Sequence, residues 1–291
     1  MSLRYDTVSF LSDYGLGDEF VGVVKSVIRS IAPEVTVVDI THDIAPHDVR
    51  AGGLALARSA QYLVPGVVLA VVDPGVGGNR RAVAVEVGDG ASVLVGPDNG
   101  LLAPAVAMVG GATRAVELTA DHLHVASPGP TFAGRDVFAP VAAHLCAGTR
   151  LDEVGTDIPV HSLTPGVVPV SRTEGERIHA EVLWIDRFGN LQVNLDPAEI
   201  ESLGDGVRLT VGDVGRNVRR VSTYGDLERG EMGVLVDSYG LVAVSVNRGS
   251  AALELSGVEG DAVTFEPADS APATPFHTPV QLQPRRSDER A

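Results

Sequence analysis

Acidic residues follow two apolar segments that have the composition of buried strands. Asp13 comes after residues 7–11, and Asp73 follows the run 67–72. Aspartate is a poor strand former, so each either caps the next turn or helix or belongs to a site. In an open parallel sheet, ligands bind beyond the carboxyl ends of the strands. Both carboxylates are therefore candidates for a ligand-binding site.

The loop after Asp73 is rich in glycine and ends in two arginines. It fits neither the G-x-G-x-x-G pattern nor a Walker motif, since no GK[ST] follows, which disfavours a nucleoside phosphate site. A loop that brings Asp73 and one of these arginines into one pocket could order a water or an anion. The alternative, for Arg80 and Arg81 alike, is a surface ion pair of little energetic value.

Four further segments carry polar turns. Residues 130–138 lead into a helix, which Asp136 is expected to cap. The other three lie in the second half of the chain and are also compatible with ordinary hairpin turns. They contain Asp186, Phe188 and Asn190, then Asp237 and Ser238, then Asn247 and Arg248.

Several classes of chemistry find no support in the sequence. The eight histidines show no H-E-x-x-H or similar spacing, so no metal site is predicted. No G-x-S-x-G nucleophile elbow is present. The single Cys146 excludes an intramolecular disulfide, and its apolar surroundings predict a buried side chain.

The charge balance bears on partners. Asp and Glu outnumber Lys and Arg by 38 to 22, a net charge of −16, which argues against a nucleic-acid partner. The excess suits a cationic small ligand, although plain solvated surfaces often share it. No apolar run approaches the ~20 residues of a membrane helix. The N-terminus lacks the features of a signal peptide, so a cytoplasmic location is expected.

Strand and helix signals alternate in the first half of the chain. Apolar residues at helical spacing predict helices over 20–31, 49–62 and 138–147. Strands are predicted at 7–11, 35–40, 67–72, 82–87 and 92–95. Strands that are apolar throughout and separated by helices imply a mostly parallel sheet covered on both faces. We therefore expect an α/β domain over residues 1–165.

The second half of the chain has a different pattern of predicted elements, with short strands and no long helix. Short strands are predicted at 178–185, 191–195, 207–211, 218–223, 233–236, 242–246 and 262–265. This pattern is typical of a small antiparallel sandwich or barrel, here over residues 172–266. Residues 159–172 are the best candidate for a linker. Residues 267–291 are expected to form a disordered tail.

Eight segments, taken together and in order, resemble one family across about residues 7–265. They are residues 10–15, 38–42, 72–77, 80–81, 96–102, 131–136, 185–190 and 247–249. The family is the S-adenosylmethionine hydroxide adenosyltransferases, relatives of the fluorinating and chlorinating 5′-halo-adenosine synthases. The resemblance implies an N-terminal α/β domain, a C-terminal β-barrel and a homotrimer. Each active site would lie between the first domain of one subunit and the second domain of the next. S-adenosylmethionine would be the substrate, with no cofactor.

The resemblance also assigns substrate-binding roles. Asp13 would hold the ribose diol, a task that suits a carboxylate because it can accept from two hydroxyls at once. Asp186 and Ser238 would hold the amino and carboxylate groups of methionine, with Asp18 as a weaker candidate. His47 stands where the halogenating relatives have an aromatic residue.

The remaining assignments concern the adenine end of the ligand. Phe188 would pack on the ligand, and Asn190 would bind the adenine. The turn that contains Asn247 and Arg248 would contact the adenine edge, largely through backbone groups.

The hydrolytic branch of this family is expected to have Asp73, Arg80 and a histidine at the position of Ala133. A carboxylate at the nucleophile site repels a halide but can orient or deprotonate water, so the resemblance implies hydrolysis to adenosine and methionine. Three explanations of Ala133 stay open: an engineered variant, a natural homologue that uses Asp73, Arg80 and water alone, or a protein that binds without turnover. Halide transfer is a further alternative.

Overall fold

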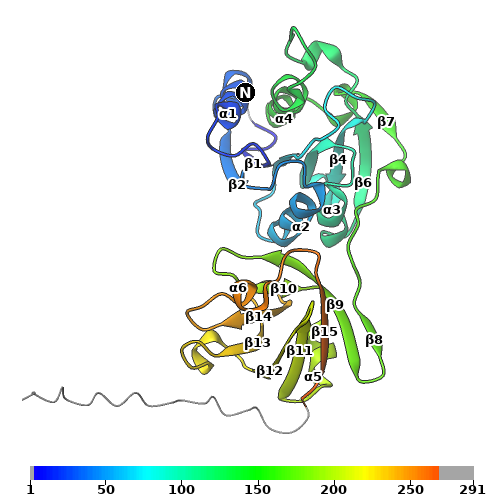
Figure 1. Ribbon diagram of the computed structural model, residues 1–291. Coiled ribbons are helices and arrows are strands. Elements are labelled where there is room, and N and C mark those ends of the chain that lie inside the picture. Colours follow the sequence, from blue (N-terminus) through cyan, green and yellow to red (C-terminus); the bar gives the residue numbers. More distant parts are fainter. Residues whose placement is uncertain (1–2, 269–291) are drawn as a thin grey trace, which may run out of the picture. The chain divides into compact units, whose positions relative to one another are not determined.

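The computed structural model describes residues 3–268 (Figure 1). The chain forms two compact units that divide between Pro169 and Val170. This division falls inside the stretch 159–172 predicted as a linker. Most of the predicted tail, 267–291, lies outside the described residues, and Pro267 is the last residue of a strand.

The first unit contains a seven-stranded sheet with the order β2-β1-β3-β5-β4-β6-β7. Its strands are β1 Thr7–Ser12, β2 Thr36–Thr41, β3 Val67–Val71, β4 Ala82–Val87, β5 Ser92–Pro97, β6 Ala112–Glu117 and β7 Thr156–Ile158. The pairs β1–β2, β1–β3 and β3–β5 are parallel, and the other three are antiparallel. The predicted α/β domain is confirmed, and its sheet is mixed. Only the short turn Gly88–Gly90 joins β4 to β5, so these strands form a hairpin without a helical crossover.

Helices cover both faces of this sheet. They are α1 Phe20–Ile31, α2 Val49–Ala60, α3 Ala103–Met108 and α4 Ala139–Cys146. Figure 1 shows α1 and α4 on one face and α2 and α3 on the other. Because side chains alternate along a strand, Phe10 packs into the core under α1 and α4, and Leu11 packs into the core under α2. Strand β1 is therefore buried on both faces and gives a fixed base to the residues that follow it.

Short helical turns complete the first unit. A π-helix, Gly134–Phe138, leads directly into α4. Four 3₁₀ turns span Gly88–Gly90, Asp121–Leu123, Leu151–Glu153 and Val160–Ser162. Cys146 is buried and free, as predicted.

The second unit is a β-barrel, which confirms the predicted fold class. Its elements are β8 Arg172–Glu174, β9 Arg177–Ile185, β10 Leu191–Val193, α5 Pro197–Glu201, β11 Gly206–Val211, β12 Val214–Arg220, a 3₁₀ turn Tyr224–Asp226, β13 Met232–Val236, β14 Val242–Val246, α6 Ala251–Leu255 and β15 Ala262–Pro267. The order is β10-β14-β13-β12-β11-β15-β9-β8, and the additional pairing of β10 with β9 closes the barrel around a core that includes Leu209 and Phe265. Among the strands of residues 3–268, β8 pairs with β9 alone.

Within residues 3–268, no helix has both the length and the apolar character needed to cross a membrane. The cytoplasmic location stays a prediction.

Candidate active site

Asp13 and Asp73 follow two neighbouring parallel strands at the same edge of the sheet. Ser12 of β1 pairs with Val71 of β3, and the backbone N–H of Asp13 donates to the carbonyl of Val71 at 3.4 Å. The amide of Asn99 donates to the carbonyl of Val72 at 2.9 Å, which fixes the end of β3. The strand-end position predicted for the two carboxylates is therefore correct.

Arg80 binds the Asp73 carboxylate through two of its nitrogens. Its Nε lies 2.9 Å and 3.1 Å from the two carboxylate oxygens, and its Nη2 lies 2.5 Å from Oδ2. The guanidinium also lies 5.2 Å from the centre of the Phe138 ring. Both side chains are largely buried, 17% and 6% exposed, so the pair is not an ordinary surface ion pair.

Arg81 does not contact Asp73 and instead forms an ion pair with Asp98. Its Nε donates to Asp98 at 2.8 Å, and its Nη1 donates to the hydroxyl of Ser162 at 3.0 Å. The other Asp98 oxygen accepts the backbone N–H of Thr164 at 2.7 Å. Arg81 thus fastens the segment 162–164 to the end of β5.

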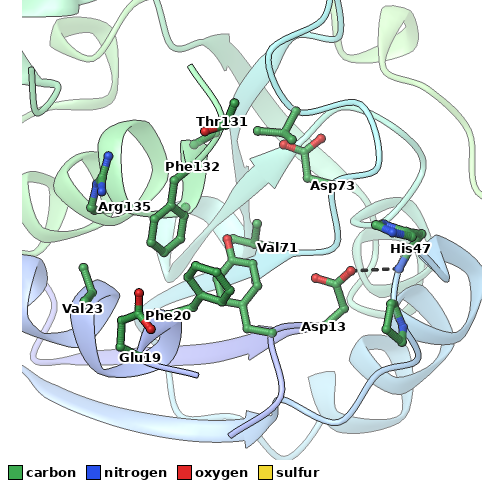
Figure 2. Close-up of a pocket in the computed structure, with 15 residues that line it drawn as sticks. Asp13, Glu19, Phe20, Val23, His47, Val71, Asp73, Thr131, Phe132 and Arg135 are labelled. Carbon is green, nitrogen blue, oxygen red and sulfur yellow. Dashed lines mark hydrogen bonds between the residues drawn. The ribbon is translucent and has the colours of Figure 1, made fainter. Parts of the chain in front are cut away.

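A pocket of about 540 Å³ opens at this edge of the sheet. Its lining includes four of the residues selected from the sequence: Asp13, His47, Asp73 and Ala133. Figure 2 shows Asp13, Asp73 and His47 on one side, and the rings of Phe20 and Phe132 on the other. Four of the six site residues predicted in the first unit therefore line one cavity, and Arg80 is paired with one of the four.

Asp13 is held against the turn that precedes α2. Its Oδ2 accepts the backbone N–H of His47 at 2.9 Å, the hydrogen bond drawn in Figure 2. His47 has a φ of 71°, a backbone conformation that is uncommon for a residue other than glycine. Asp48 then caps α2, with its side chain accepting the N–H of Ala51 at 2.8 Å. The carboxylate of Asp13 thus links β1 to this strained turn.

Ala133 lines the pocket immediately before the π-helix Gly134–Phe138. The expectation that Asp136 caps a helix is wrong, because Asp136 lies inside this π-helix. Its carboxylate accepts hydrogen bonds from Nε and Nη2 of Arg135 at 2.6 Å and 3.0 Å. Arg135 in turn stacks over the ring of Phe132 at 5.1 Å.

The pocket also contains residues that the sequence analysis did not select. Tyr14, Phe20 and Phe132 form an aromatic cluster with ring centres 5.1 to 5.8 Å apart. Glu19 lines the pocket, whereas the weaker candidate Asp18 is exposed outside its lining. Tyr14 could have been selected from the sequence, because it is an aromatic residue that directly follows the candidate carboxylate Asp13.

The barrel has a second pocket, of about 700 Å³. All six residues assigned to the ligand in this half of the chain line it: Asp186, Phe188, Asn190, Ser238, Asn247 and Arg248. Phe188 is 76% exposed. Ten of the twelve predicted site residues thus line two pockets, one in each unit.

The turn after β9 is organised by the Asp186 carboxylate. It accepts the backbone N–H groups of Phe188 and Asn190 at 2.8 Å and 2.9 Å, and the Asn190 amide at 2.7 Å. Gly189 between them has a φ of 81°, and a Cβ there would lie 2.0 Å from the hydroxyl of Ser250. Glycine is therefore required at this position.

Across residues 3–268, no group of three or more His, Cys, Asp or Glu side chains has a geometry suited to a metal ion.

A family model for the SAM (S-adenosylmethionine) hydroxide adenosyltransferase N-terminal domain matches residues 8–155. The model for the C-terminal domain of the same family matches residues 180–264. The chain belongs to the SAM hydroxide adenosyltransferase family. Both pockets lie in the parts that these two models match.

Individual relatives agree with this assignment. The chain is 45% identical over 254 residues to a protein of Salinispora tropica named (R)-S-adenosyl-L-methionine hydrolase, covering 87% of this chain and 95% of that one. It is 30% identical over 288 residues to a fluorinase of Actinopolyspora mzabensis, covering 88% and 95%. A solved structure from Thermotoga maritima, described as an uncharacterized conserved protein, superposes with a TM-score of 0.83 at 35% identity, covering 89% and 99%.

Proposed function

We propose that this protein hydrolyses SAM at the ribose C5′, giving adenosine and L-methionine. The observation that carries the proposal is the buried Asp73–Arg80 pair at a pocket that also contains Asp13. A carboxylate held in place by a guanidinium can orient water and accept its proton. Arg80 is not a base, because arginine stays protonated in proteins.

The reaction is a single displacement. The water oxygen attacks C5′, and the C5′–S bond breaks with its electron pair moving to sulfur, so the sulfonium becomes the neutral thioether of methionine. One water proton passes to Asp73 and then to solvent, while the other stays on the new 5′-hydroxyl. The leaving group needs no protonation, which is compatible with turnover when Ala133 supplies no acid–base group.

The charges of the pocket suit this substrate. Asp13, Glu19 and Asp73 bring three carboxylates to the lining, and Arg80 pairs with the last of them. Arg135, the lining arginine, is paired with Asp136. A sulfonium cation is attracted to such a surface, whereas a halide is repelled by the Asp73 carboxylate. This favours water over halide as the nucleophile.

The sequence left the configuration at sulfur open. Since the Salinispora relative is named for the (R)-sulfonium, we take the (R)-epimer as the preferred substrate. Incubation with each epimer, followed by chromatography, tests the activity. We expect adenosine to accumulate from the (R)-epimer. Bound but unchanged SAM would identify a non-catalytic binding protein, and a halide-dependent 5′-halo-5′-deoxyadenosine peak would identify a halogenase.

The assembly is part of the same proposal. Each unit has its own pocket bordered by an exposed aromatic ring, Phe20 in one and Phe188 in the other. In the second pocket Phe188, Tyr224 and Tyr239 are all exposed, and a group of exposed apolar side chains rimmed by polar residues is typical of a surface that a partner covers. We infer a homotrimer in which the first pocket of one subunit and the second pocket of the next enclose one substrate.

A further inference from the structure

Tyr14 holds a fixed position in the first pocket. It follows Asp13 in the turn after β1, and its backbone N–H donates to the hydroxyl of Ser12 at 3.4 Å. The next residue, Gly15, donates its N–H to the carbonyl of His42 at 2.8 Å. The Tyr14 ring meets Phe132 edge-on at 5.6 Å, which limits its rotation.

The hydroxyl of Tyr14 lies against the backbone of Gly134, beside Ala133. A Cβ at Gly134 would lie 2.1 Å from this oxygen, so glycine makes room for it. Tyr14, Asp73 and Ala133 line the same cavity. Among the residues that the structure describes, no hydrogen bond engages the Tyr14 hydroxyl. One donor and one acceptor are therefore available to a molecule in the pocket.

The charges around Tyr14 keep its hydroxyl protonated. Burial raises the pKa of Tyr14 above its ordinary value, and the Asp13 and Asp73 carboxylates raise it further, against an opposing effect of Arg80. Both carboxylates thus disfavour the phenolate form of Tyr14. A neutral phenol at neutral pH can donate and accept hydrogen bonds, but it cannot take a proton from water.

We propose that Tyr14 is a catalytic residue that contacts the nucleophilic water on the side where Ala133 leaves room. The inference rests on the proposed hydrolysis. Asp73 accepts one O–H of the water and the Tyr14 oxygen accepts the other, so that a lone pair of the water is aimed at C5′. The proton still leaves through Asp73, and Tyr14 keeps its own.

Tyr14→Phe removes only the hydroxyl and keeps the ring in its aromatic cluster. We expect kcat for adenosine release to fall at least ~10-fold, with KM within about threefold, because the contact is to water and not to the substrate. Tyr62→Phe, at an exposed tyrosine outside the pocket lining, is the matched control and should keep the parent rate. In an Ala133→His background the loss should shrink to less than about threefold, because the imidazole would orient the same water.

Gly134→Ala tests the geometry independently, since the added methyl group displaces the Tyr14 hydroxyl. Its kcat should fall as in Tyr14→Phe. Gly22→Ala is the control, because a Cβ at that position in α1 meets nothing within 4 Å. An active parent whose rate is unchanged in Tyr14→Phe would overturn the role of Tyr14 alone. A parent that releases no adenosine would overturn the proposed hydrolysis as well.

Discussion

Arg80 donates hydrogen bonds to Asp73 through Nε and Nη2, with the closest contact at 2.5 Å. The Asp73 side chain also lines the first pocket. This geometry depends on a planar guanidinium, because a lysine ammonium is a point charge that cannot bind both carboxylate oxygens in the same fixed orientation. The orientation of Asp73 is therefore a property of the pair.

Arg80→Lys should lower kcat for adenosine release by about 10- to 100-fold, since the proton acceptor loses its orientation while the positive charge is kept. Steady-state kinetics with saturating SAM measures this effect. Arg81→Lys is the matched control, because Arg81 makes a similar pair with Asp98 away from the pocket lining. Arg81→Lys should change the thermal stability of the protein but leave its rate of adenosine release close to that of the parent. Equal losses in both variants would contradict the role of the Asp73–Arg80 pair.

Asp13→Ala should weaken ligand binding, because the ribose hydroxyls lose a shared acceptor and the His47 turn loses its anchor. A hydrogen bond to a charged group contributes ~1.5–3 kcal/mol, which corresponds to an increase in Kd of about tenfold or more. Calorimetric titration with adenosine or SAM measures it. Asp43→Ala, at an exposed residue outside the pocket lining, is the control and should leave the affinity unchanged. Unaltered affinity in Asp13→Ala would remove Asp13 from the site.

Ala133→His should raise hydrolysis at least ~10-fold, a change of ~1.4 kcal/mol in the barrier, while substrate affinity stays within about threefold. An imidazole beside Asp73 can exchange a proton near neutral pH. Adding Asp73→Ala to this variant should abolish most of the gain, because the two residues act as a unit. Adenosine release is compared for the parent, the single variant and the double variant. A rate that does not respond to Ala133→His would show that position 133 does not face the water.

The composite site predicts complementation between two impaired variants. Asp73→Ala removes the proton acceptor of the first pocket and Asn190→Ala impairs the second pocket, so each protein alone should have little activity at SAM concentrations below KM. Co-expressed subunits of a homotrimer should recover activity in about a quarter of the sites, where two intact pockets meet. Light scattering should give the mass of three chains. A monomeric mass with intact activity, or co-expressed subunits that stay inactive, would refute the composite site.

Sequence patterns predicted the elements whose periodicity is strong. The helix at 20–31 and the strand at 82–87 occur with the predicted bounds, because their apolar residues follow one period throughout. Strands β7 and β8 have three residues each, too few for a period to be visible. The antiparallel half of the first sheet was missed because local sequence does not reveal pairing partners.

The candidate site, like the fold, was predicted where the sequence carries a local signal and missed where it does not. Asp13 and Asp73 were found because aspartate interrupts apolar strands, a local signal. Asp136 was assigned to a helix cap because no local signal distinguishes a π-helix from an α-helix start. The position of the Tyr14 hydroxyl depends on the space that Gly134 leaves for it. Gly134 lies 120 positions further along the chain, so only the fold brings the two residues together.

The most direct test of the central claim is to follow the oxygen of the attacking water. The protein is incubated with (R)-SAM in ¹⁸O-labelled water, and both products are analysed by mass spectrometry. Attack at C5′ by water predicts one ¹⁸O in adenosine and none beyond background exchange in methionine, with an Asp73→Asn variant releasing little of either product. Unlabelled adenosine, or no adenosine from a protein that binds SAM, would contradict the account.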